Sequence, residues 1–318
     1  MFNGVNNLQY LNLYNVENDD KGIISVSNTG NLIVCQRNEI IKDAKENKCC
    51  YFNVDNGKCE SENFVVLYSN NEEEKEFVEN NWENIDFIIH GDHKKQYKES
   101  DNIILHPFSR IEIYFSSSLV TLSKIFMDMN DIESIDFTYL DTSSVTDMSY
   151  MFYNCASLKS INLSNFQTSS LQNMNKMFDS CNQLESMDLS NFDFSSATDM
   201  SFMFNNCSSI KSIILPSSNT PLLNNMESMF SECVSLSSIN LENFETSLVT
   251  NMAKLFYKCE SLVSLNLSSF NTEKVQDMSE MFSNCLGLNI LDISNFNMES
   301  CENSENMFSG INNIKFIN

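Results

Sequence analysis

The apolar positions of this chain repeat with a period of 26 residues from residue 125 to the C-terminus. A Met-Phe pair or a close variant begins each unit, and no insertion or deletion separates one unit from the next. The units begin at Ile125, Met151, Met177, Met203, Met229, Leu255, Met281 and Met307. Self-similarity at such a period is typical of proteins whose repeats stack on one another.

Each unit contains a segment such as "SLKSINLSNF", residues 157–166, in which apolar and polar residues alternate before a turn. This pattern predicts a short β-strand. The return segment starts at an Asp or Asn, where the N-cap of a short helix is expected. That column holds Asp147, Asn173, Asp199, Asn225, Asn251, Asp277 and Asn303. We therefore expect an α/β solenoid with short parallel strands and short helices.

A Met, a Phe and a Cys lie close together in every unit, as Met151, Phe152 and Cys155 do, and raise the question of redox or metal chemistry. The Cys column holds Cys155, Cys181, Cys207, Cys233, Cys259 and Cys285, but Met129 and Ile311 at its ends. A catalytic or metal-binding thiol is not replaceable by these side chains, whereas a small buried apolar group is. The column is interpreted as packing, and oxidation between stacked thiols is not required by the pattern.

An Asn column precedes the Phe that ends the strand segment, at Asn165, Asn191, Asn243 and Asn295, with Ser217 and Ser269 between them. Stacked amides bond to the backbone of a neighbouring coil, so we expect an internal ladder with a structural role.

The remaining sequence divides into three parts. Residues 1–17 fit the repeat out of phase and form a partial repeat, while residues 104–124 form a degenerate first coil ahead of the solenoid at 125–318. Residues 18–103 read as a small α+β insert that covers the start of the solenoid. Its strands are expected in "GNLIVCQ", "NFVVLYS" and "IDFIIHG", and its helices in "RNEIIKDAKE" and "EEEKEFVENNW". Because both ends fall inside a repeat, we expect the chain to be a fragment whose signal and anchor are not visible.

The insert holds an even number of cysteines, Cys35, Cys49, Cys50 and Cys59. Two disulfides suit an extracellular location. No pair of CxxC motifs is present, which argues against zinc.

The formal net charge of −24 excludes nucleic acid and anionic lipid surfaces as partners, because both repel such a chain. No apolar stretch has the length of a bilayer span, so we expect no direct membrane insertion by this part of the protein.

The strand residues between the apolar positions face the open, concave side of the expected solenoid. This candidate binding face is polar and acidic. Its residues are Asp136, Asn162, Asp188, Asn240, Asn266, Asp292, Ser134, Ser160, Ser186, Ser238 and Ser264. Ser212 and Ile214 occupy the same two columns. Simple solvation of a sheet explains such rows. The alternative is a surface for basic protein segments, with glycans or Ca²⁺ less favoured. We expect no cofactor and no metal.

An enzyme is supported only by "HGDH", which places His90, Asp92 and His93 together in the insert. The trio matches no ligand spacing, and a polar turn at a strand end explains it, so we expect no enzyme. Three glycosylation sequons begin at Asn162, Asn206 and Asn266, and two of them lie on the candidate face.

The unit "SLKSINLSNFQTSSLQNMNKMFDSC", and above all "VTDMSYMF" at 145–152, resembles the BspA-like leucine-rich repeat family and its 26-residue bacterial surface-protein repeat. The resemblance covers residues 119–318 and 1–16. It implies a right-handed solenoid of the leucine-rich-repeat type on a cell surface or outside the cell. It also implies adhesion to host or matrix proteins or other cell-surface molecules. A passive spacer that displays another domain is the alternative. The stretch "IILPSSNTPLL" departs from the repeat, and the insert has no counterpart in it.

Overall fold

The computed structural model describes residues 119–130, 132–137, 139–311 and 314–317, together with the strands that lie between residues 10 and 115. The described residues contain strands and turns. The strands are β1 (Tyr10–Asn12), β2 (Leu32–Cys35), β3 (Cys50–Asn53), β4 (Lys58–Cys59), β5 (Phe64–Ser69), β6 (Lys75–Phe77), β7 (Ile85–His90), β8 (His93–Lys95), β9 (Ile103–Leu105), β10 (Arg110–Phe115), β11 (Ile132–Asp136), β12 (Ser186–Asp188), β13 (Ser212–Ile214), β14 (Ser264–Asn266), β15 (Ile290–Asp292) and β16 (Lys315–Ile317).

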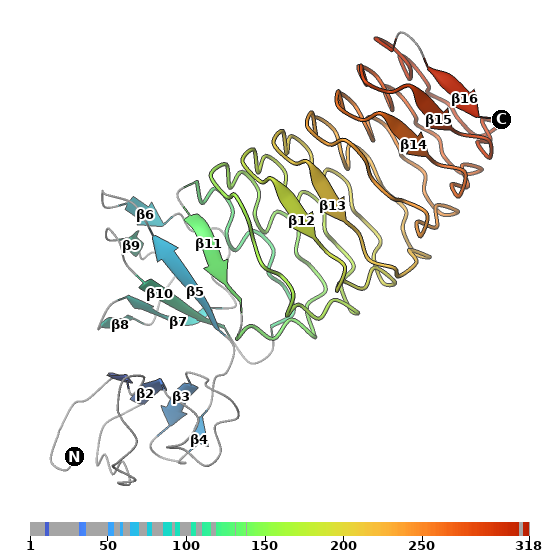
Figure 1. Cartoon of the computed structure of the whole chain (residues 1–318). Coiled ribbons are helices and arrows are strands. Elements are labelled where there is room, and N and C mark those ends of the chain that lie inside the picture. The colour runs from blue at the N-terminus through green and yellow to red at the C-terminus, as the bar shows by residue number, and fades with distance from the viewer. Residues whose placement is uncertain are drawn as a thin grey trace, which may run out of the picture.

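The 26-residue units form a row of stacked coils in which each residue lies beside its equivalent in the next unit (Figure 1). Strand β12 pairs in parallel with β13, and β14 pairs with β15, with partners 26 residues apart. A second line of parallel bridges joins Thr121, Asp147, Asn173, Asp199, Asn225, Asn251, Asp277 and Asn303 on the return side. The predicted period therefore sets the register of the whole row.

The return segment, which we call the turn side, contains no helix among the described residues, so the predicted short helices are wrong. Between Met148 and Cys155, backbone amides alternate between two acceptors. Tyr150 and Phe152 donate to carbonyls of the next coil, whereas Met151 donates to the carbonyl three residues earlier. Linked tight turns thus replace an α-helix, whose amides would all bond within the coil.

Two residues in each coil of the turn side adopt positive φ, as Tyr150 and Asn154 do at 57° each. This conformation is unfavourable for a residue other than Gly, by about 1–2 kcal/mol. It persists because it points the alternate amides toward the next coil. The Asp or Asn at the start of the segment accepts the amide two residues on, as Asp147 does from Ser149 at 2.8 Å. The column expected to cap helices therefore shapes turns.

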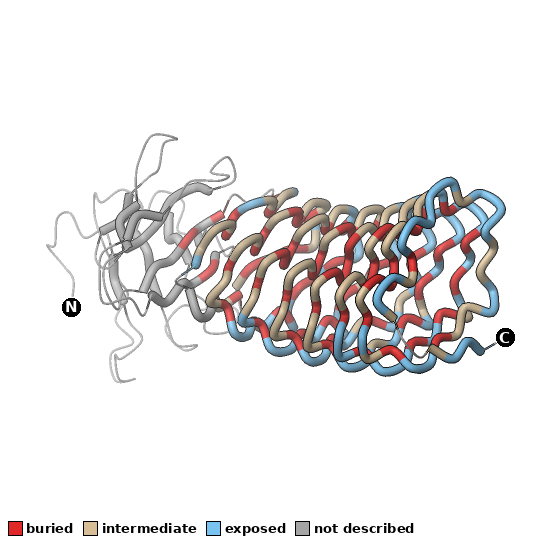
Figure 2. The backbone as a smooth tube through the Cα atoms, turned by 90° about the horizontal axis from the view of Figure 1, so that it is seen from above, coloured by how far each residue is buried: buried red, intermediate tan, exposed pale blue. Residues whose placement is uncertain are grey.

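Stacked phenylalanine rings run through the interior of the row. Neighbouring rings, such as Phe152 and Phe178, lie 5.3 Å apart between centroids and are inclined by 10°. The stack continues through Phe126, Phe152, Phe178, Phe204, Phe230, Phe256, Phe282 and Phe308. Figure 2 shows buried positions recurring from coil to coil along the row. The Met-Phe pair is thus the centre of the apolar core.

The Cys column lies in the same core, and each of its six thiols is buried. Each thiol also donates a hydrogen bond to a Phe carbonyl of the preceding coil, as Cys207 does to Phe178 at 3.1 Å. Burial raises the pKa of these thiols, for Cys155 to about 12. The packing interpretation is consistent with this burial, and the hydrogen bond explains why Cys suits the position.

The Asn ladder is confirmed at three of its positions. Asn191 donates to the Leu163 carbonyl at 3.0 Å, and Asn243 and Asn295 donate to carbonyls of their preceding coils. A buried Thr column, which the sequence reasoning did not single out, adds to it. Thr246 donates its hydroxyl to the Asn271 carbonyl and accepts the Asn271 amide.

The N-terminal part contributes separate sheets. Strands β5, β7, β8, β10 and β11 form one sheet in the order β11-β5-β10-β7-β8, and β11 pairs antiparallel with β5. Since β11 lies in the first unit, this sheet is hydrogen-bonded to the start of the row (Figure 1). The three strands expected in the insert are confirmed as β2, β5 and β7.

Two predictions for this part are wrong. Residues 75–77, expected in a helix within "EEEKEFVENNW", form β6, which pairs with β9. Residues 110–115, expected in the degenerate first coil, form β10 between β5 and β7, although Thr121 and Leu122 do join the row. The helix expected in "RNEIIKDAKE" lies outside the described residues. No helix long and apolar enough to cross a bilayer occurs in the described part of the chain.

Candidate binding face

The outward surface of the parallel strands, which we call the strand face, consists of two exposed columns on either side of a buried residue. The first column holds Ser160, Ser186, Ser212, Ser238 and Ser264, and the second holds Asn162, Asp188, Ile214, Asn240, Asn266 and Asp292. Strands β12 to β16 show this face toward the viewer in Figure 1. Most of the predicted face residues are thus brought together along one surface.

Two predicted residues have a different setting. Ser134 and Asp136 belong to β11, whose partner is the antiparallel β5 of the N-terminal sheet. The side chain of Ser134 lies outside the described residues. Asp136 is half-buried and is the register partner of Val66. Any binding that uses these two positions would involve the N-terminal sheet as well as the row.

The Asp and Asn side chains of the second column take part in the fold. In each case Oδ1 accepts the backbone amide two residues on and so closes the turn that ends the strand. The Asp188 carboxylate accepts from Ser190 at 2.9 Å, and Asn240 accepts from Glu242 at 3.0 Å. Asn162, Asn266 and Asp292 do the same. The sequence signal is an Asn or Asp two residues before a turn residue, a spacing that allows the side chain to accept the turn amide.

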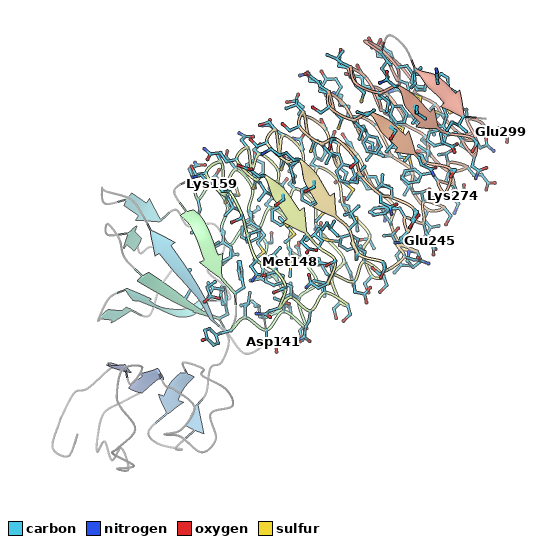
Figure 3. All side chains as sticks on the ribbon, viewed as in Figure 1. Asp141, Met148, Lys159, Glu245, Lys274 and Glu299 are labelled. Atoms are coloured by element: carbon cyan, nitrogen blue, oxygen red, sulfur yellow. The ribbon has the colours of Figure 1, made fainter. Side chains whose placement is uncertain are left out.

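The electrostatics of the face are mixed. Hydrogen bonds from the Ser190 hydroxyl and amide lower the pKa of Asp188, so its exposed carboxylate stays ionised. On the column that precedes the serines, Lys211 pairs with Glu185 at 2.8 Å. Lys159 lies at one long edge of the row, while Asp141, Glu245, Lys274 and Glu299 follow the opposite edge (Figure 3). Negative charge therefore remains on the face itself at Asp188.

One coil interrupts the second column. Ile214 occupies the position of the Asp or Asn, and its side chain cannot accept the amide two residues on. That residue is Pro216, which has no amide hydrogen to donate. Both halves of the turn hydrogen bond are absent together, so the change leaves no unpaired backbone donor. Ile214 is 54% exposed and is the register partner of Asp188.

The core beneath this coil is altered in a matching way. Ser218 occupies the column that otherwise holds Phe, at Phe192 and Phe244, while the buried Phe194 occupies the Thr column. The Phe194 ring lies 6.2 Å from Phe192 and 6.4 Å from Phe244 between centroids. The Ser218 hydroxyl accepts the Phe194 amide at 2.8 Å. Phe194 thus supplies an aromatic bridge where the repeat lacks its ring.

A pocket of about 490 Å³ opens on the strand face at this coil. Its apolar lining comes from Ile214, Leu215, Pro216, Ile239 and Phe244, and Ser212, Ser238, Asn240 and Asn243 contribute polar groups. The departure from the repeat is visible in the sequence, but the sequence does not predict a pocket. The signal was an apolar residue in a column that is polar in every other unit.

Other candidate chemistry receives no support from the described residues. They contain no cluster of three or more His, Cys, Asp or Glu residues able to hold a metal ion. His90 and His93 are register partners where β7 meets β8, and Asp92 lies outside the described residues. The side chains of the four cysteines of the insert also lie outside them, so their disulfides stay a prediction.

Comparison with known proteins identifies a matching family model and a similar solved structure. A family model described as "Mycoplasma protein of unknown function, DUF285" matches residues 120–238 and 224–316. The crystal structure of a leucine-rich cell surface protein from Faecalibacterium prausnitzii is similar at 15% identity and a TM-score of 0.19, covering 55% of this chain and 78% of that one. Among curated proteins, none matches the sequence.

Proposed function

We propose that this chain, which belongs to the DUF285 family, is a non-enzymatic cell-surface repeat protein that binds proteins through its strand face. In this proposal the row of coils is a right-handed solenoid of the leucine-rich-repeat type, as its resemblance to BspA-like repeats implies. The division into a partial repeat, an insert, a first coil and a solenoid belongs to the same proposal.

The observation that carries the proposal is the contrast between what the fold uses and what it leaves exposed. The Phe, Met, Cys and Thr columns are buried, and the turn-side amides are paired within or between coils. The serines of the first column and the polar residues of the second remain exposed in regular rows, except Asp292, which is half-buried. A long, open, polar surface of this kind suits protein adhesion better than it suits the enclosed chemistry of an enzyme.

The partners proposed are host or matrix proteins, or other molecules of a cell surface. The ionised Asp188 and the acidic side chain of Asp292, together with the net charge of −24, favour basic segments on the partner. Such charges act mainly on the rate of encounter, because they attract the partner before contact.

The test compares the chain with a variant carrying Asp188→Asn and Asp292→Asn. Asn keeps the Oδ1 that accepts the turn amide, as Asn162, Asn240 and Asn266 show, and removes only the charge. Association with immobilised matrix proteins is measured at low and at physiological ionic strength. We expect the double variant to associate several-fold more slowly at low salt and to depend less on salt.

A matched control changes two acidic residues elsewhere, Glu245→Gln and Glu299→Gln, at the long edge of the row. It removes the same net charge from the molecule without touching the strand face. Equal slowing by both double variants would show that overall charge, and not the strand face, attracts the partner. If the wild type binds and both double variants bind at the same rate as the wild type, the strand face has no role in binding.

A passive spacer is the second candidate, and the continuity of the coils favours it. Inter-coil hydrogen bonds recur from Leu122 to Asn284 at the same backbone positions, which makes a stiff body. A spacer would bind no matrix protein at either salt concentration.

A further inference from the structure

We propose that the pocket at Ile214 is the anchor site of the strand face and takes one large apolar side chain, Leu or Phe, from a partner segment with Lys or Arg on both sides. This inference rests on the proposed function and names the kind of segment that the face binds.

The first support is the local reversal of polarity. The second column is Asn or Asp in the neighbouring coils, where these side chains accept a turn amide. Ile214 interrupts this arrangement, and 54% of its surface is exposed. Leu215 and Ile239, which line the same pocket, are half-buried. An apolar floor with an exposed apolar rim favours contact with another apolar group over contact with water.

The second support is that the fold accommodates this coil without a local defect. Pro216 removes the donor that Ile214 cannot satisfy, and Phe194 supplies a ring near the place where Ser218 lacks one. Pro216 is buried, and its carbonyl accepts a hydrogen bond from the Asn243 side chain. The pocket is therefore a formed feature of a packed core.

The third support is size. A volume of about 490 Å³ lies within the range of roughly 300–1,000 Å³ that ligand pockets occupy, and this pocket is open to solvent on one side. It has room for one large side chain and its neighbouring backbone. Ser212, Ser238 and Asn240 at its rim offer hydroxyl and amide groups to that backbone. A buried anchor with a polar rim is the usual composition of an interaction hot spot.

Charge complementarity selects the flanking residues of the partner. Asp188 is the register partner of Ile214 and is ionised, and Glu242 is exposed beside Asn243 of the pocket lining. The nearby Lys211 is paired with Glu185, so its charge is offset. A partner with cations on both sides of its apolar residue matches these two carboxylates.

The experiment uses the whole chain and two fluorescein-labelled peptides, Lys-Lys-Phe-Lys-Lys and Lys-Lys-Ser-Lys-Lys, with binding followed by fluorescence anisotropy. We expect the chain to bind the Phe peptide about tenfold more tightly than the Ser peptide, since a well-placed anchor contributes about 1–2 kcal/mol. Ile214→Asp, which restores the polarity of the column, should abolish this preference.

The matched control is Val263→Asp. Val263 lies two coils farther along the same side of the row and is 52% exposed, so the substitution has the same chemistry and nearly the same exposure. It should leave the preference for the Phe peptide unchanged. A third variant, Glu242→Gln, should weaken both peptides and keep the preference. Circular dichroism before the binding experiment confirms that each variant is folded.

The outcomes separate this inference from the proposed function. Equal binding of the two peptides by the wild type, or equal effects of Ile214→Asp and Val263→Asp, overturns the pocket. If matrix proteins still bind through Asp188 and Asp292 in that case, the strand-face function stands. If the chain prefers the Phe peptide but binds no matrix protein, the pocket stands and the proposed class of partner is wrong.

Discussion

The turn side and the strand face belong to the same coils but use their residues in opposite ways. On the turn side, amides from Met148 to Cys155 are paired within the coil or with the next one, and Phe rings stack beneath them. On the strand face, the buried residues lie in single columns and the side chains between them point to solvent. Conspicuous sequence motifs such as "MF" and Cys therefore report packing, while inconspicuous Ser and Asp positions carry the surface available to partners.

The largest effect that distinguishes the two sides is expected at alkaline pH. Burial raises the pKa of the six thiols above its ordinary value, and for Cys155 and Cys285 to about 12. Their contribution to stability is therefore complete below about pH 9 and is lost as pH rises toward about pH 12, because the unfolded thiols ionise first. Each thiol that ionises in the unfolded chain but stays protonated in the folded one lowers the free energy of unfolding by up to about 1.4 kcal/mol per pH unit.

Urea unfolding at about pH 8 and about pH 10 measures this dependence. The chain should be markedly less stable at the higher pH, and Cys207→Ala should have a shallower dependence because it has one thiol fewer. If the free energy of unfolding is the same at both pH values, the Cys column is not buried as described.

The next effect concerns the ring stack of the turn side. Phe230 is fully buried, with its ring centroid 6.0 Å from Phe204 and 5.7 Å from Phe256. Phe230→Ala should lower the free energy of unfolding by about 3–5 kcal/mol, since it opens a cavity in a continuous stack. Ile214→Ala on the strand face is the control and should change it by about 0.5 kcal/mol or less. Similar losses for both would remove the distinction between the two sides.

A smaller effect is expected from one position of the Cys column. Cys207→Ala should cost about 1–2 kcal/mol at neutral pH, because it removes a small buried group and its hydrogen bond to the Phe178 carbonyl. Binding to a partner should be unchanged once the variant is folded. A folded variant without any binding would show that the thiol has a functional role and not a packing role.

The sequence predicted the stacking register because a strict period of 26 residues leaves one way to align equivalent side chains. It predicted the strands at Ser186–Asp188 and Ser264–Asn266 from alternation, and the Asn ladder from its column. It did not predict the turn side correctly. An Asp or Asn before an apolar run is typical of both a helix N-cap and an Asx turn, and Asp147 takes the second role. Nothing in residues such as Tyr150 indicates a positive φ, which the next coil imposes.

The candidate site was predicted only in outline. The two exposed columns follow from alternation, but three-dimensional pairing decides their surroundings. Strand β10 fits the repeat pattern at Ile111 and Tyr114 yet pairs with β5 and β7, and β11 carries Asp136 into the same sheet. The pocket depends on residues from two coils, Ile214 and Phe244 among them, so a single unit does not reveal it.

The smallest effect tests whether the acidic column supports the fold as well as the surface. The Asp292 carboxylate accepts the Ser294 amide at 3.0 Å, so Asp292→Ala should lower the free energy of unfolding by about 0.5–1.5 kcal/mol, the net contribution of one hydrogen bond. Asp292→Asn keeps Oδ1 and should leave it unchanged. Ile214→Ala should also have little effect, because the residue two positions on is Pro216, which has no amide hydrogen to donate. Urea unfolding of the three variants measures the loss of stability that each substitution causes. If Asp292→Asn is as damaging as Asp292→Ala, the charge itself stabilises the turn, and the charge-removal variants then change folding and binding together.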